Sequence, residues 1–108
     1  MEYNKGALLN YIKLWNKQAY LKIIKIKDQK EKEEVLKYSI ISYLDKEYDH
    51  LEKKEQEMEQ KKQDIFFVKN KLLMLSSKIK FVKATYHKEE IEKAINLIND
   101  IKKEIKDV

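Results

Sequence analysis

Residues 65–86 read IFFVKNKLLMLSSKIKFVKATY and carry the widest apolar stripe of the chain. Apolar residues recur there at alternating steps of three and four, closed by a tyrosine: Ile65, Val68, Leu72, Leu75, Ile79, Val82 and Tyr86. This spacing places them on one face of an α-helix. The stripe is widened by Phe66, Phe67, Leu73, Met74 and Phe81. A stripe of this width predicts more than one neighbouring helix, so we expect residues 65–86 to form the centre of a core.

A seven-residue repeat extends the pattern toward the N-terminus. Its apolar members are Leu44, Leu51, Met58, Ile65, Leu72 and Ile79, and Tyr86 continues the same spacing. No proline or glycine interrupts it, because the only glycine is Gly6 and the chain has no proline. A sustained seven-residue repeat is typical of helices that pack along another helix. We therefore expect the six apolar members to form a core or a self-association interface.

The repeat is weak around Met58, because Lys54 and Lys61 occupy the positions where a second apolar residue would complete it. We expect either a turn or an exposed, partner-facing shaft there.

Helix-start signals divide the chain into four expected helices. These span about residues 5–27, 29–62, 65–84 and 87–106 in a single all-helical domain of residues 1–108. Asn4 is an expected N-cap for the first helix, and Asp28 with Glu31 has the form of a capping box for the second. Asp64 and Thr85 are suited to begin the later two. The predicted fold class is all-α, with three or four helices in an antiparallel bundle or helical hairpin with coiled-coil character.

Two alternatives to these boundaries stay open in the sequence. Residues 31–84 as one helix would be about 80 Å long and would need a partner chain along them. A break near residues 62–64 instead folds the chain back and brings Leu51 near Leu75, with apolar residues facing one another along the hairpin. Typical helix lengths favour the break, whereas the uninterrupted register favours one helix. The β-branched residues 21–27 could form a strand, although no partner strand is visible, so we favour helix.

Composition limits the classes of function. The chain has 108 residues, 43% hydrophobic and 40% charged, which suits one domain with a modest core and is too apolar for a disordered tail. It has no cysteine, so disulfides, thiol nucleophiles and cysteine metal sites are excluded. No segment approaches the about 18 apolar residues of a membrane span, and no signal peptide is recognisable. We expect a cytoplasmic protein.

Charge alternates along the chain. Residues 1–27 carry a net +5, residues 28–64 a net −4, residues 65–88 six lysines without any acid, and residues 89–108 a net −2. One interpretation is that oppositely charged helices pack side by side, with exposed pairs of small energetic value. The other places the first and third helices together, so that their lysines form one positive face for an acidic protein or nucleic acid.

No constellation of catalytic, cofactor-binding or metal-binding residues is found. Glu47 and His50 have the Glu-x-x-His spacing of di-iron carboxylate bundles, but a second such motif is missing. A single glycine cannot build a glycine-rich phosphate loop. We therefore expect neither an enzyme nor a cofactor.

The predicted function is a non-enzymatic helical protein–protein interaction module. It would be a small self-associating adaptor, chaperone or inhibitor/regulator, of the kind that phages or mobile elements encode, with a protein partner and a homo-oligomeric state. The alternative is nucleic-acid binding through a lysine-rich face, by phosphate contacts alone because the chain has no arginine. Candidate partner-binding residues are Tyr11, Trp15, Lys69, Lys78, Lys80 and Lys83.

Overall fold

The structure, a computed structural model, describes residues 5–106, and the expected N-cap Asn4 lies outside this range. Its five helices are α1 (Lys5–Trp15), α2 (Lys17–Ile24), α3 (Gln29–Gln60), α4 (Phe66–Thr85) and α5 (Lys88–Lys106). The described range contains no strand, which confirms the all-α fold class and removes the strand alternative for residues 21–27. None of these helices is long and apolar enough to cross a lipid bilayer.

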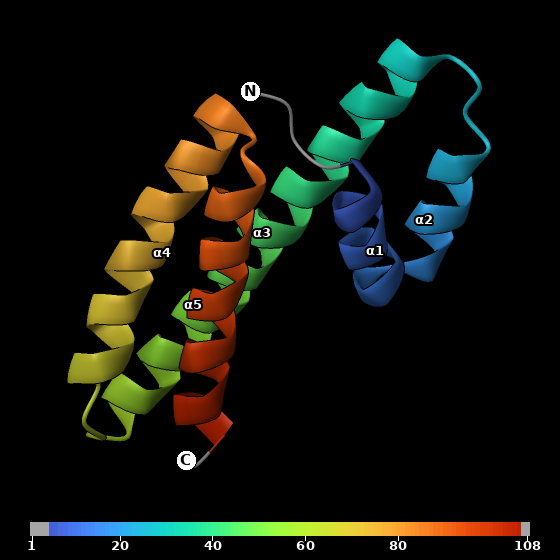
Figure 1. The fold of residues 1–108 in the computed structure, drawn as a ribbon. Coiled ribbons are helices and arrows are strands. Elements are labelled where there is room, and N and C mark those ends of the chain that lie inside the picture. Colours follow the sequence, from blue (N-terminus) through green and yellow to red (C-terminus); the bar gives the residue numbers. More distant parts are fainter. Residues whose placement is uncertain (1–4, 107–108) are drawn as a thin grey trace.

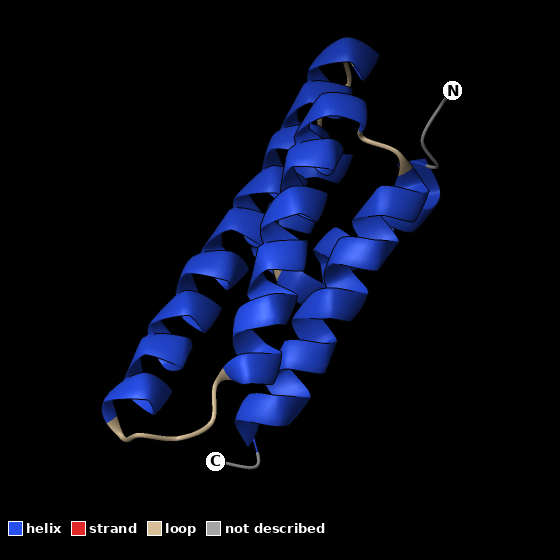
Figure 2. Cartoon of the chain, turned by 90° about the vertical axis from the view of Figure 1, so that its left-hand side faces the viewer, coloured by secondary structure: helices blue, strands red, loops and turns tan. Residues whose placement is uncertain are grey.

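The three long helices lie side by side, and consecutive ones run in opposite directions (Figures 1 and 2). The two short helices, α1 and α2, form a hairpin that packs on α3. α4 packs on α3 and α5, on the opposite side of the molecule from that hairpin (Figure 1). The chain therefore has an elongated shape of 51 × 28 × 16 Å, with α4 along one side.

The chain breaks between α3 and α4, so residues 31–84 form two helices. Lys62 adopts a left-handed conformation, with φ of 59°. The N–H of Gln63 donates to the carbonyl of Met58 at 3.0 Å and that of Lys62 to the carbonyl of Glu59 at 3.0 Å, which is the hydrogen-bond pattern of a Schellman motif. Asp64 then accepts a hydrogen bond from the N–H of Phe66 at 3.0 Å, so its carboxylate satisfies a free donor at the start of α4.

The first expected helix, residues 5–27, is wrong as a single element. Asn16 has an extended backbone, with φ −153° and ψ 95°, and its side chain accepts from the N–H of Ala19 at 3.1 Å. Asparagine is a favoured N-cap because its carbonyl satisfies one free helical N–H. This cap divides the segment into α1 and α2, and α2 ends at Ile24.

The cap expected at Asp28 is found with a different partner, whereas the expectation that Thr85 caps the last helix is wrong. Asp28 precedes α3 and accepts from the N–H of Lys30 at 3.0 Å, whereas the capping box predicted the N–H of Glu31. Thr85 is the last residue of α4, and its hydroxyl accepts from the N–H of His87 at 3.3 Å just before α5 begins. The left-handed Tyr86 between them, with φ of 54°, ends α4.

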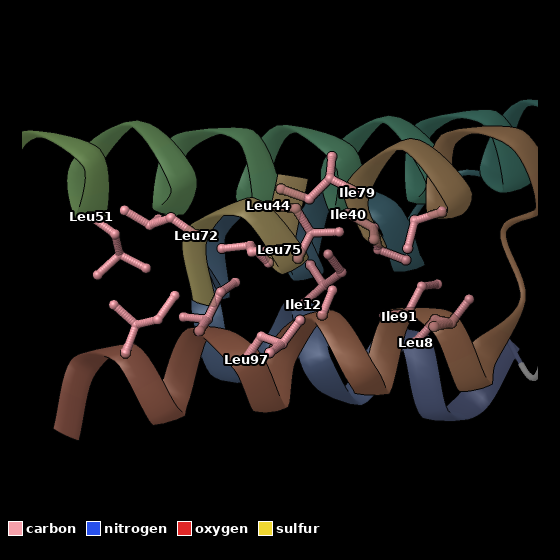
Figure 3. Packing of buried hydrophobic residues seen from close by; sticks show 14 of the residues in the cluster. Leu8, Ile12, Ile40, Leu44, Leu51, Leu72, Leu75, Ile79, Ile91 and Leu97 are labelled. Carbon is pink, nitrogen blue, oxygen red and sulfur yellow. The ribbon is translucent and has the colours of Figure 1, made fainter. Parts of the chain in front are cut away.

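The core lies between α3, α4, α5 and the α1 side of the hairpin (Figure 3). Its buried residues come from all five helices and include Leu8, Leu44, Leu75, Val82, Ile91 and Ile98, each fully buried. Five members of the seven-residue repeat are at most 6% exposed: Leu44, Leu51, Met58, Leu72 and Ile79. Ile65 is partly buried against the same cluster. These side chains are therefore packed within one chain, which leaves them little surface for a second copy.

The expectation that the whole apolar stripe of residues 65–86 is core is wrong for the five residues that widen it. Val68, Leu72, Leu75, Ile79 and Val82 are at most 5% exposed, as the pattern predicts. The widening residues are exposed instead, at 76% for Phe66, 42% for Phe67, 63% for Leu73, 51% for Met74 and 55% for Phe81. The physical reason is that α4 has neighbours on the α3 and α5 sides only.

Candidate interaction surface

The outward side of α4 is the most apolar exposed surface of any helix in the described chain. We call it the outer face; it consists of Phe66, Phe67, Asn70, Leu73, Met74, Ser77, Phe81 and Ala84, all exposed. Figure 2 is viewed from this side and shows α4 between α3 and α5, with no other helix over it. Contiguous apolar patches on water-soluble proteins commonly mark interaction sites. This surface is therefore our candidate functional site.

The helical repeat arranges the outer face in three rows. Phe66 and Leu73 form one row and Phe67, Met74 and Phe81 another, each with a seven-residue step that keeps side chains aligned along a helix. The smaller side chains of Asn70, Ser77 and Ala84 lie between the two rows at the same step. The Asn70 side-chain amide donates to the carbonyl of Phe66 at 2.9 Å, so one of its two N–H donors is used within the helix.

Lysines flank the outer face on both sides, and they fall into two groups. α4 contains five lysines and no acid. Lys78 donates to Glu90 of α5 at 2.9 Å, Lys71 lies 3.9 Å from Asp100 of α5, and Lys83 lies 3.3 Å from Asp45 of α3. Lys69 and Lys80 form no ion pair with any residue that the structure describes. Of the four candidate lysines, two are thus paired within the chain and two are available to a partner.

The Lys78–Glu90 pair is the closest of these contacts. The hydrogen bond from Lys78 is the largest influence on Glu90 and lowers the pKa of its carboxyl below the usual value. A further interhelical pair joins Lys102 of α5 to Glu47 of α3 at 3.2 Å. Oppositely charged helices therefore do pack side by side, as one interpretation of the charge pattern predicts.

The other interpretation, one positive face made by the first and third helices, is wrong. The α1–α2 hairpin and α4 lie on opposite sides of the molecule (Figure 1). Lysines of the two segments therefore cannot merge into one face.

The candidate residues Tyr11 and Trp15 lie far from α4, in a stack of three aromatic rings. The Trp15 indole stacks on Tyr43 of α3, with centroids 3.8 Å apart, and on Tyr11 with centroids 5.6 Å apart. The Tyr11 hydroxyl donates to Glu92 of α5 at 3.2 Å. The Trp15 indole thus takes part in an intramolecular stack that joins α1 to α3.

A groove of about 510 Å³ lies beside this stack. The residues that line it include Trp15, Tyr43, Glu47, His50 and Lys102. Burial and the neighbouring Glu47 carboxylate raise the pKa of Tyr43 to about 12. No cluster of three or more potential metal-ligating side chains occurs among the described residues, so the structure adds no ligand to the Glu47–His50 spacing.

Sequence reasoning identified the five large apolar side chains of the outer face but assigned them to the core. The missing information is the number of helices that cover α4, which helical periodicity does not contain. The one signal within the segment is its row of small residues, Asn70, Ser77 and Ala84, which repeats on the side opposite the core stripe.

Comparison with protein-family models, with curated proteins and with solved structures gives no match to this chain. Its function is therefore argued from its own geometry.

Proposed function

We propose that this chain is a non-enzymatic, helical protein–protein interaction module that binds a protein partner through the outer face of α4. One observation carries the proposal: five large apolar side chains of a single helix are 42–76% exposed while the opposite side of that helix is fully packed. Leaving such side chains in water forgoes about 1.5–3 kcal/mol for each one that a partner could bury completely. A partner that covers the outer face would recover part of that free energy.

The proposed mode of action is occlusion or scaffolding. A partner segment would lie along α4, and the rest of the chain would act as the rigid support that holds α4 straight. This suits a small cytoplasmic adaptor, chaperone or inhibitor, including a regulator from a phage or mobile element. We also propose that the long helices pack as an antiparallel bundle with coiled-coil character, and that the partner packs along α4 in the same manner.

The test uses affinity capture from extracts of the source cells. The L73Q/F81Q variant replaces two side chains of the outer face, 63% and 55% exposed. The matched control is L14Q/L21Q, which replaces two exposed leucines, 81% and 37%, on the α1–α2 hairpin. Circular dichroism checks that both variants keep their helix content.

The proposal expects a specific protein that is captured by the wild type and by L14Q/L21Q and lost with L73Q/F81Q. Equal capture by all three proteins, or loss with the hairpin variant alone, would move the site away from α4.

Nucleic-acid binding is the second candidate, favoured by the unpaired ammonium groups of Lys69 and Lys80. It would give an affinity that falls steeply with salt and a smaller slope after replacement of Lys78, Lys80 and Lys83 by glutamine. Three features count against it: the absence of arginine, the intramolecular stacking of Trp15 on Tyr11 and Tyr43, and the intramolecular ion pairs of Lys78 and Lys83. Phosphate contacts would also leave the five apolar side chains of the outer face unused.

A further inference from the structure

The outer face of α4 has the relief of a helix-binding seam. Two rows of large side chains border a row of smaller ones. Phe66 and Leu73 form the first row, and the second consists of Phe67, Met74 and Phe81. Helices pack by inserting the side-chain ridges of one into the grooves of the other. The row of Asn70, Ser77 and Ala84 provides such a groove, parallel to the helix axis. With 20 residues, α4 offers about 30 Å of it, which matches a partner helix of about five turns.

The charged side chains that α4 itself places beside this groove are all positive. Lys71 and Lys78 lie toward α5 and are paired with its acids, while Lys69 and Lys80 are unpaired. Lys69 and Lys80 are eleven residues apart, which places them on the same flank of the helix with a separation of about 16 Å along its axis. A complementary surface would present carboxylates along that flank, because unlike charges beside an apolar seam determine which partner and which orientation are accepted.

A second copy of the chain does not supply these carboxylates at this face. A symmetric dimer brings the same surface patch of both subunits together. Because α4 contains no acid, either direction of α4–α4 pairing would place lysines against lysines. The like charges would oppose such a dimer.

An anionic membrane would neutralise the lysines, but it would leave polar side chains of the groove without hydrogen-bond partners. Insertion of Phe66, Leu73 and Phe81 into the acyl region would also bury the Ser77 hydroxyl and the side-chain amide oxygen of Asn70. Water could not solvate these two polar groups there. A partner helix can instead set its own side chains against these groups. We infer that the outer face binds an amphipathic α-helix of a different protein, with acidic residues along the edge of its apolar side.

This inference rests on the proposed function and names the chemistry of its partner. Its test uses two synthetic helical peptides of about five turns with the same leucine seam. One has glutamate and the other lysine at the positions beside the seam. Fluorescence anisotropy measures the affinity of each labelled peptide for the full-length protein at two salt concentrations.

We expect the glutamate peptide to bind at least about tenfold more tightly than the lysine peptide, with the difference shrinking at high salt. The variant K69E/K80E should reduce that preference by at least about tenfold. L73Q/F81Q should abolish binding of the glutamate peptide, and L14Q/L21Q should leave its affinity unchanged. All of these positions are exposed, so each variant is expected to fold.

Equal affinity for the two peptides, or a preference that survives K69E/K80E, would overturn the inference. Binding to phosphatidylserine vesicles that depends on Leu73 and Phe81, without peptide binding, would overturn it in favour of a membrane. If neither peptide binds but affinity capture still depends on the outer face, the acidic helix is wrong and the proposed function stands. If capture is also independent of that face, both fail.

Discussion

α4 and α5 are neighbouring helices of almost equal length, but they differ in how many of their apolar side chains are exposed to water. In α5 the side chains of Ile91, Ala94, Leu97, Ile98 and Ile101 are buried, and every exposed side chain described in that helix is polar or charged. In α4 the inner side is equally buried, but the outer side exposes three phenylalanines, a leucine and a methionine. Both helices pack on α3 and on each other.

The difference teaches that neighbours decide burial as much as residue type does. A helix that is apolar on most of its circumference is usually surrounded by other elements. α4 has only two such elements beside it, so its apolar surface exceeds what the single chain can cover. The proposed partner would cover the remainder, whereas the exposed side chains described in α5 are all polar or charged.

Replacing an inner and an outer leucine of α4 gives the sharpest contrast in stability. Leu75 is fully buried, so Leu75→Ala should leave a cavity and reduce the free energy of unfolding by about 2–5 kcal/mol. Leu73 is 63% exposed, so Leu73→Ala should change it by no more than about 0.5 kcal/mol. Urea unfolding followed by circular dichroism measures both. Similar losses for the two variants would mean that the outer face is packed.

The aromatic side chains extend the contrast to pH. Those of α4 face water, whereas Tyr43 lies in the stack with Trp15, and its pKa rises from 10.0 to about 12. Because the folded state holds the neutral phenol, this stabilisation is complete below about pH 10 and is lost as the pH rises through about 12. Allowing for solvent screening of a partly buried group, the loss is on the order of 1–2 kcal/mol.

The comparison of wild type with Tyr43→Phe isolates this contribution, because the two proteins share every other titratable group. The free energy of unfolding should fall more steeply for the wild type between pH 10 and 12. Parallel pH profiles of the two proteins would show that the phenol of Tyr43 titrates normally.

The starts of α4 and α5 differ in a smaller way. Asp64 accepts the N–H of Phe66 at 3.0 Å, so Asp64→Ala should cost about 1 kcal/mol, and Asp64→Asn should retain most of that stability. The corresponding bond to Thr85 is longer, at 3.3 Å, and the same hydroxyl already donates to the carbonyl of Phe81. Thr85→Ala should therefore cost less than Asp64→Ala in thermal unfolding. The reverse order would contradict the relative strength assigned to these two hydrogen bonds.

The sequence contained enough information to predict the buried side of α4 and the starts of α3 and α4. The steps from Val68 to Val82 determine the buried side of α4, and Asp28 and Asp64 indicate where α3 and α4 begin, because both features depend on local geometry. Asn16 also carried a cap signal, which the apolar spacing from Ile12 to Ile23 concealed. Whether Leu73 and Phe81 are covered depends on how many helices surround α4, and that is a property of the whole arrangement.

The most direct measurement of the difference between α4 and α5 is site-specific photo-crosslinking in the source cells. A photoreactive phenylalanine analogue replaces Leu73 on the outer face of α4 or Asn99, which is exposed on α5, in otherwise identical proteins. If α4 carries the binding surface, position 73 gives a discrete adduct with a different protein and position 99 does not. Adducts of equal yield at both positions, or an adduct only at position 99, would contradict the assignment of binding to α4.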